Sequence, residues 1–227
     1  MSANSFQDGN IHLWKADLDT LSPSRLYPHL DNLEQQRAQH YQLPLARSRF
    51  IASRGQLREI LSLCTGLPPA QLLIAYTPHG KPFLPALPDW HFSVSHSCNL
   101  AVWAISYGRE VGIDIELIRP ELPLKTLIPR TLSPREQEAL AQHEGDPTSL
   151  FLHFWTRKEA FLKATGEPNF AHLPQIDASN PNGQLSLYSP QSNAWNPADN
   201  WQSHSFDSFP NCVTSIATQG PKPIIQL

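Results

Sequence analysis

Apolar and non-apolar residues alternate strictly in the segment Val111–Glu116 (VGIDIE), near the middle of the chain. Because successive side chains of a β-strand point to opposite faces, the apolar set faces one way and Asp114 and Glu116 face the other. The pattern therefore predicts a strand with one face on the core. Two adjacent carboxylates raise each other's pKa unless a positive group lies between them. A hard cation such as Mg²⁺ would satisfy both, whereas a solvated acidic sheet face would need no ligand, and this pattern alone leaves both interpretations open.

A helix downstream supplies a third carboxylate. An Asp-Pro start and a glycine stop predict a helix over residues 147–165. Within it, Glu159 and Lys163 are four residues apart and therefore neighbours on the helix surface. As an exposed ion pair they would contribute only about 0.3–0.5 kcal/mol. Glu159 follows Trp155 by one turn and so borders the buried face, where a carboxylate beside a lysine suits a site for a metal and a phosphate.

The other patterns predict an α+β protein. Expected strands cover 11–18, 72–76, 90–95, 100–106, 184–188 and 213–217, and expected helices cover 31–41, 44–65 and a segment that begins at 134. The proline-rich segment 77–89 is expected to be a loop. Strand, helices and strands follow one another twice, which predicts two similar α+β halves, 1–108 and 109–227. A site at the seam between them is expected.

Composition excludes several classes of function. A formal net charge of -3 over 227 residues argues against a nucleic-acid partner. No apolar run approaches the roughly 18 residues of a membrane span, and the polar N-terminus lacks a secretory pattern. The cysteines Cys64, Cys98 and Cys212 show neither a disulfide framework nor zinc-ligand spacing. We therefore expect a soluble, cytoplasmic protein.

Several basic and polar residues are candidates for phosphate contacts. They are Arg47, Arg54 and Arg58 on one stripe of the helix 44–65, Lys81 in a Gly-Lys-Pro turn, and Ser95 and His96 at a strand end. Each also has an ordinary explanation, as a solvated arginine, a turn lysine or a locally bonded histidine.

Taken together, these motifs resemble the signature of the 4′-phosphopantetheinyl transferases. In chain order they are Gly80-Lys81-Pro82, FSVSHS at 92–97, GIDIE at 112–116 and WTRKEAFLKATG at 155–166. The resemblance spans roughly residues 37–166, whereas the C-terminal quarter carries no matching motif. Ser93 stands where the family usually has Asn, although a serine still donates and accepts. Length and layout resemble the larger, surfactin-synthetase-activating type, a pseudo-dimer of two α+β halves in one chain with its active site at the seam.

The resemblance implies an enzyme that transfers 4′-phosphopantetheine from coenzyme A to a serine of an apo acyl or peptidyl carrier protein. Such carriers serve fatty-acid, polyketide or nonribosomal peptide synthesis, and the reaction uses Mg²⁺ and releases 3′,5′-ADP. It also implies a monomer, and the composition argues against a nucleic-acid or membrane partner. The stretch 122–132, with Arg130 and Arg135, is a candidate surface for the carrier.

Matched motif by motif, the resemblance also assigns site residues. The implied Mg²⁺ ligands are Asp114, Glu116 and Glu159, and the implied catalytic residues are Glu159 and Lys163. The implied coenzyme A contacts are Arg54, Thr77, Lys81, Ser95, His96, Lys158 and Lys163. Glu159 would accept the serine proton either directly or through a metal-bound water, and the sequence leaves both routes open.

Two rival functions make different sequence predictions. A non-catalytic protein that binds a carrier or coenzyme A would be expected to have lost one acidic residue, yet Asp114, Glu116 and Glu159 are all present. Another Mg²⁺-dependent phosphoryl or nucleotidyl transferase would be expected to carry a P-loop, and the sequence contains no GxxxxGK[ST] motif.

Overall fold

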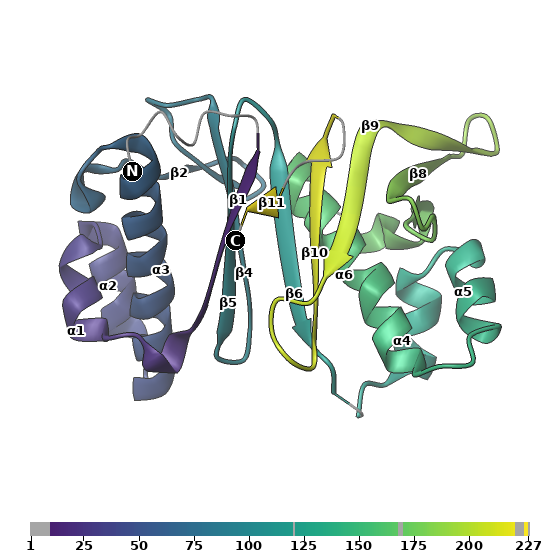
Figure 1. The fold of residues 1–227 in the computed structure, drawn as a ribbon, viewed down its shortest axis with the longest axis horizontal. Coiled ribbons are helices and arrows are strands. Elements are labelled where there is room, and N and C mark those ends of the chain that lie inside the picture. The colour runs from purple at the N-terminus through teal and green to yellow at the C-terminus, as the bar shows by residue number, and fades with distance from the viewer. Residues whose placement is uncertain (1–9, 120, 168–169, 221–224, 227) are drawn as a thin grey trace.

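Two β-sheets lie side by side between two groups of helices (Figure 1). The computed structural model describes residues 10–119, 121–167, 170–220 and 225–226. The first group of elements comprises β1 (Ile11–Asp17), α1 (Pro23–Leu26), α2 (Asn32–His40), α3 (Pro44–Thr65), β2 (Ala75–Tyr76), β3 (Pro82–Phe83), β4 (Trp90–Ser97) and β5 (Leu100–Tyr107). The second comprises β6 (Val111–Leu117), α4 (Leu124–Thr131), α5 (Pro134–Ala141), α6 (Pro147–Thr165), β7 (Ile176–Asp177), β8 (Gln184–Ser189), β9 (Ala194–Phe206), β10 (Cys212–Gln219) and β11 (Ile225–Gln226). Short 3₁₀ turns lie at Leu18–Thr20, Tyr27–His29, Pro69–Gln71 and Phe170–Gln175.

The two sheets repeat one topology. One sheet has the order β11-β1-β5-β4 and the other β6-β10-β9-β8-β7. In each, the opening strand pairs antiparallel with the last long strand, which pairs antiparallel with the long strand before it. In the sequence, a long helix comes between the opening strand and the two long strands of each sheet: α3 in the first half and α6 in the second. The predicted α+β class and its two similar halves are therefore confirmed.

The last described residues complicate the division into halves. β11 pairs in parallel with β1, so residues 225–226 extend the sheet of the first half. The boundary between residues 108 and 109 remains a prediction, with this strand as a crossing element.

Local capping explains where three helices begin. Asp31 and Glu34 form a capping box at α2, and Ser133 and Glu136 form another at α5. The Asp146 side chain accepts hydrogen bonds from two backbone N–H groups at the start of α6. These predicted starts are confirmed.

Elsewhere the predicted elements differ from the structure. The strand expected at 72–76 is only Ala75–Tyr76, and the expected loop 77–89 contains β3, which pairs with it in a hairpin. α4 and β9 were not predicted. α4 contains Pro129 and β9 contains Pro197, and a proline usually interrupts a helix or a strand.

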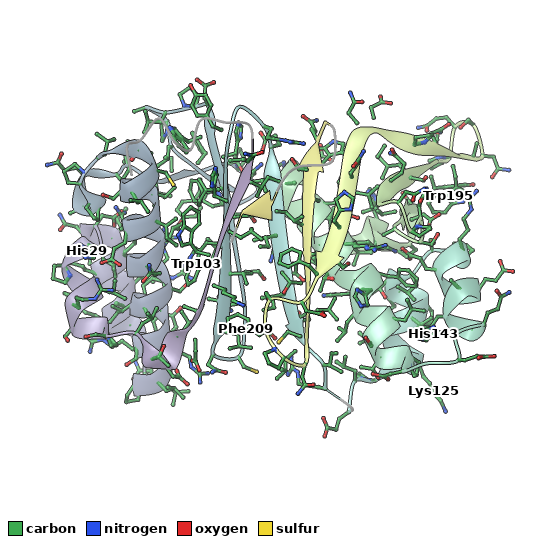
Figure 2. The ribbon with its side chains drawn as sticks, in the orientation of Figure 1. His29, Trp103, Lys125, His143, Trp195 and Phe209 are labelled. Atoms are coloured by element: carbon green, nitrogen blue, oxygen red, sulfur yellow. The ribbon has the colours of Figure 1, made fainter. Side chains whose placement is uncertain are left out.

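Apolar cores lie on both sides of each sheet. Trp103 of β5, labelled in Figure 2, is fully buried and packs with Leu57 and Leu61 of α3. Between the sheets, Ile113 of β6 packs in one cluster with Ile11 of β1. The alternating strand thus turns its apolar residues toward the other sheet and its acidic face toward α6. None of the helices in the described part of the chain combines the length and apolar character of a membrane span.

Candidate active site

Three carboxylates line one pocket at the seam. Asp114 and Glu116 project from β6, and Glu159 projects from α6, which packs across that strand. The pocket has a volume of about 340 Å³ and also contacts Ser95 of β4. Asp114 is 4% exposed and Glu159 is 8% exposed, so both are nearly removed from water. The predicted metal ligands are therefore brought together.

Lys163 is the cation that the pocket contains. Its Nζ donates to Asp114 Oδ1 at 2.7 Å and to Ser95 Oγ at 2.9 Å. The Ser95 hydroxyl in turn donates to the same Asp114 oxygen at 2.8 Å. Lys163 and Ser95 thus hold Asp114 from two different elements.

Glu159 has a raised pKa. Burial is the main cause, the charge of Asp114 adds to it, and Lys163 opposes it, so that the pKa rises to about 7. Burial and the charge of Asp114 likewise raise the pKa of Glu116, against a hydrogen bond from Ser97. The pocket is therefore short of positive charge even with Lys163 present.

The donor set is suited to an additional cation. Asp114 Oδ2 and Glu159 Oε1 are buried and have no hydrogen-bond partner, which is costly unless something satisfies them. Within the described part of the chain, no three His, Cys, Asp or Glu side chains are arranged to hold a metal ion unaided. The two unsatisfied carboxylate oxygens nevertheless are hard ligands of the kind that Mg²⁺ takes.

A second cavity shares Val94, Glu159 and Lys163 with this pocket, and we call it the seam cavity. It has a volume of about 310 Å³. Its lining consists of Arg54, His79, Gly80, Lys81, Pro82, Phe92, Ser93, Val94, Glu159, Leu162, Lys163 and Gly166. Glu159 and Lys163 border both cavities, so an extended ligand lying in the seam would reach the carboxylates.

The predicted phosphate contacts occupy different positions. Arg54 lines the seam cavity, where it donates to Glu34 and to the Tyr76 hydroxyl. His96 is exposed at the edge of the acidic pocket. Lys81 lines the seam cavity but contacts Glu110. Thr77 is not in the lining of the seam cavity and lines a neighbouring cavity that Lys81 also borders.

Lys158 requires a correction. Its side chain is fully buried, and its Nζ contacts Glu136 at 2.5 Å and the carbonyls of Thr131 and Leu173. It therefore points away from the seam cavity, although Glu159 follows it directly in the sequence. Adjacent helix residues project about 100° apart, so the Lys158 and Glu159 side chains contact different parts of the protein.

Two of the predicted arginines on α3, Arg47 and Arg58, do not line the site either. Arg58 is fully buried and bonds Asp31, Glu34 and two backbone carbonyls, which makes it a structural residue. Arg47 lines a separate open cavity on the helical side of the first half.

Three contacts at the site were not predicted. Ser97 donates to Glu116 at 3.0 Å, and Ser93 accepts from the Ile113 backbone N–H at 3.1 Å. The period of two in the serines of FSVSHS could have indicated this shared face. The contact of Lys81 with Glu110 had no such signal.

Comparison with known proteins places the chain in a family. The family model described as the 4′-phosphopantetheinyl transferase superfamily matches residues 110–209. The 4′-phosphopantetheinyl transferase HetI of Nostoc sp. is 36% identical over 216 residues, which is 92% of this chain and 88% of that protein. Sfp of Bacillus subtilis is 31% identical over 61% of each chain. The chain therefore belongs to the 4′-phosphopantetheinyl transferase superfamily. Within it, the similarity to Sfp supports the larger, surfactin-synthetase-activating type.

A solved structure with a related description is more distant. It is a holo-(acyl-carrier-protein) synthase from Bacillus anthracis in complex with coenzyme A (3′,5′-ADP). It is 20% identical, with a TM-score of 0.33, over 49% of this chain and 96% of that one.

Proposed function

We propose that this protein transfers the 4′-phosphopantetheine group of coenzyme A to a serine hydroxyl of an apo acyl or peptidyl carrier protein and releases 3′,5′-ADP. One observation carries the proposal: Asp114, Glu116, Glu159 and Lys163 line one pocket in a chain that belongs to this superfamily. Glu159 and Lys163 also border the seam cavity, where coenzyme A would lie.

In this proposal Asp114, Glu116 and Glu159 hold Mg²⁺. A bound Mg²⁺ would neutralise charge on the phosphate oxygens during transfer. Two of these residues have buried oxygens without a partner, and that supports their assignment as ligands.

Glu159 and Lys163 have the proposed catalytic roles. A carboxylate whose pKa is raised to about 7 is matched to accepting a proton near neutral pH. Glu159 would take the proton of the carrier serine, and its position beside the seam supports that role. Lys163, on the same helix face, would donate to the phosphate oxygens as charge develops there.

A non-catalytic protein that binds coenzyme A is the main alternative. It would require a positive cavity but no buried, desolvated carboxylates. Keeping two unsatisfied acidic oxygens in the fold is costly, so their presence favours catalysis over simple binding.

The decisive experiment is a transfer assay with intact-mass detection. The protein, coenzyme A and Mg²⁺ are incubated with apo carriers from fatty-acid, polyketide and peptide synthesis, and one added phosphopantetheine group is expected on at least one of them. Binding of coenzyme A without transfer to any carrier would favour the alternative.

Asp114→Asn tests the metal assignment. It should abolish Mg²⁺ binding measured by calorimetry and lower transfer by at least about a hundredfold, as is typical when a transition-state charge contact is lost. Glu144→Gln, which removes an exposed carboxylate elsewhere, is the matched control. Full activity and Mg²⁺ binding in Asp114→Asn would refute the assignment.

Location and assembly complete the proposal. Cys64, Cys98 and Cys212 are all unpaired, which supports a reducing compartment and hence the cytoplasm. Both walls of the seam come from one chain, which supports a monomer. Light scattering coupled to gel filtration tests the monomer, since a stable dimer would contradict it.

A further inference from the structure

The ammonium group of Lys81 already has partners within the protein, so it is not free to bind a phosphate. Its side chain is only 14% exposed, and its Nζ donates to Glu110 and to the carbonyl of Ala164. An ammonium group has three N–H donors, so two of them already have protein partners. To bind a ligand phosphate with all of its donors, Lys81 would have to leave a carboxylate and a helix end.

Glu110, which contacts Lys81, is itself held in place by two other residues. Its carboxylate also lies 3.3 Å from His91 Nδ1 of β4, and its backbone carbonyl accepts from Thr218 of β10. Burial by itself would raise the pKa of Glu110, but the hydrogen bonds and charges of His91 and Lys81 outweigh it and lower the pKa to about 2. Glu110 is therefore an anion at any pH at which the protein would work.

The other partner of Lys81 is the C-terminal end of α6. Lysines near the last carbonyls of a helix interact favourably with its dipole. Gly166 ends the helix in the left-handed conformation, and a Cβ there would lie 3.2 Å from Lys81 Cδ. The stem of Lys81 thus lies across the glycine that ends α6.

The backbone of Lys81 is hydrogen-bonded to Thr77 within the β2–β3 hairpin. Its N–H donates to Thr77 Oγ1 at 3.1 Å, and its carbonyl accepts from the Thr77 N–H at 2.9 Å. These bonds close the turn of the β2–β3 hairpin, which forms one wall of the seam cavity. α6, with Glu159 and Lys163, forms the facing wall.

We propose that Lys81, held by Glu110 directly before β6 and by the Ala164 carbonyl at the end of α6, forms a clasp between the β2–β3 hairpin and the second half, and that this clasp, as a positioning device, sets the width of the seam cavity for coenzyme A. The inference rests on the proposed function. Lys81 then acts on coenzyme A through the spacing of the two walls and not through a direct phosphate contact.

The test is a double-mutant cycle with Lys81→Met, Glu110→Gln and the double variant. The dissociation constant of coenzyme A is measured by calorimetry without a carrier, and KM and kcat are measured with one. Each single variant should raise the dissociation constant and KM by about 3- to 30-fold, which lies within the interaction energies of residues in contact, with kcat within about twofold. The double variant should be no worse than either single one, and Lys81→Arg should retain most of the affinity.

A matched ion pair provides the control. Glu59 accepts hydrogen bonds from Arg25 and His29 on the helical side of the first half, just as Glu110 does from Lys81 and His91. Figure 2 labels His29 among the outer helices, remote from the second half. Glu59→Gln should leave the affinity for coenzyme A unchanged.

A direct phosphate contact makes the opposite prediction. Glu110→Gln would then release Lys81 and leave the affinity unchanged or improved, Lys81→Met would weaken it, and the effects would add, which would overturn the clasp. If the wild type bound no coenzyme A at all, the proposed function would fail. The clasp would then be decided by the same cycle in thermal midpoints, in which additive effects would refute it.

Discussion

Three serines of β4 connect the two halves through their side chains. Ser95 holds the Asp114 carboxylate, Ser97 donates to Glu116, and Ser93 accepts from the Ile113 backbone N–H. β4 and β6 belong to different sheets, so these hydroxyls take the place of a backbone ladder. The residues that position the acidic site are thus also those that join the sheets at this edge.

Removing the Ser93 hydroxyl tests this role. Ser93→Ala leaves the buried Ile113 N–H without its acceptor, and the free energy of unfolding should fall by about 1–3 kcal/mol. Urea denaturation measures the change, and Ser192→Ala at an exposed position should cost almost nothing. Equal stability of the two variants would show that the seam does not depend on this hydrogen bond.

At the scale of elements, the site depends on how closely α6 approaches β6. Gly112 lies against the backbone of α6, where a Cβ would be 1.9 Å from the Ala160 carbonyl oxygen. That close contact brings Glu159 over the acidic face of the strand. On its other side α6 is held by the fully buried pair of Lys158 and Glu136.

Gly112→Ala should separate the two elements. Because the obstructing atom is backbone, relief requires movement of the helix, and we expect a loss of about 3 kcal/mol or more, at the upper end of overpacking costs. Thermal denaturation measures it. Gly145→Ala, whose new Cβ would meet only the end of the His143 side chain, should change little, and a comparable loss in both variants would contradict the explanation.

Lys158→Met should destabilise the packing of α5 against α6. Burial lowers the pKa of Lys158 and raises that of Glu136, and their mutual attraction opposes both shifts. Removing one partner leaves a buried charge, for which a loss of about 3–5 kcal/mol is typical. In urea denaturation, the double variant Lys158→Met/Glu136→Gln should recover part of that loss. A double variant that is less stable than the single one would contradict the ion-pair explanation.

At the scale of the whole molecule, further contacts join the halves besides the apolar cluster between the sheets. Lys15 of β1 donates to the Ser208 carbonyl and lies 5.3 Å from the centre of the Phe209 ring in the second half. Figure 2 labels Phe209 near the lower ends of the strands, where the two sheets meet. β11 adds backbone pairing with β1, and Lys81 adds its contact with Glu110.

The contact between Lys81 and Glu110 should make stability sensitive to acid. The pKa of Glu110 is lowered to about 2 from an ordinary 4.5, so its contribution is complete above about 4.5 and is lost as the pH falls toward 2. The charged or titratable groups that interact with Glu110 are Lys81 and His91, and Lys81 also donates to the Ala164 carbonyl of α6. Urea denaturation between pH 6 and 3 should show a smaller decline in stability for Glu110→Gln than for the wild type. Parallel declines would mean that Glu110 is not shifted.

The sequence by itself determined the elements whose signals are local. A cap, a glycine stop and an alternating strand act within a few residues, so the bounds of α6 and β6 and the shared face of Asp114 and Glu116 could be predicted. The motifs likewise placed Glu159 and Lys163 on one helix face.

Only the tertiary structure decided which polar residues reach the site. Arg58 was a candidate by its spacing on the helix and Lys158 through the family resemblance, yet each is buried against partners from distant segments. Lys81 meets Glu110 across the seam. Such pairings depend on how the helices pack on the sheets, because a side chain takes the nearest compensating charge that packing provides. No local pattern carries that information.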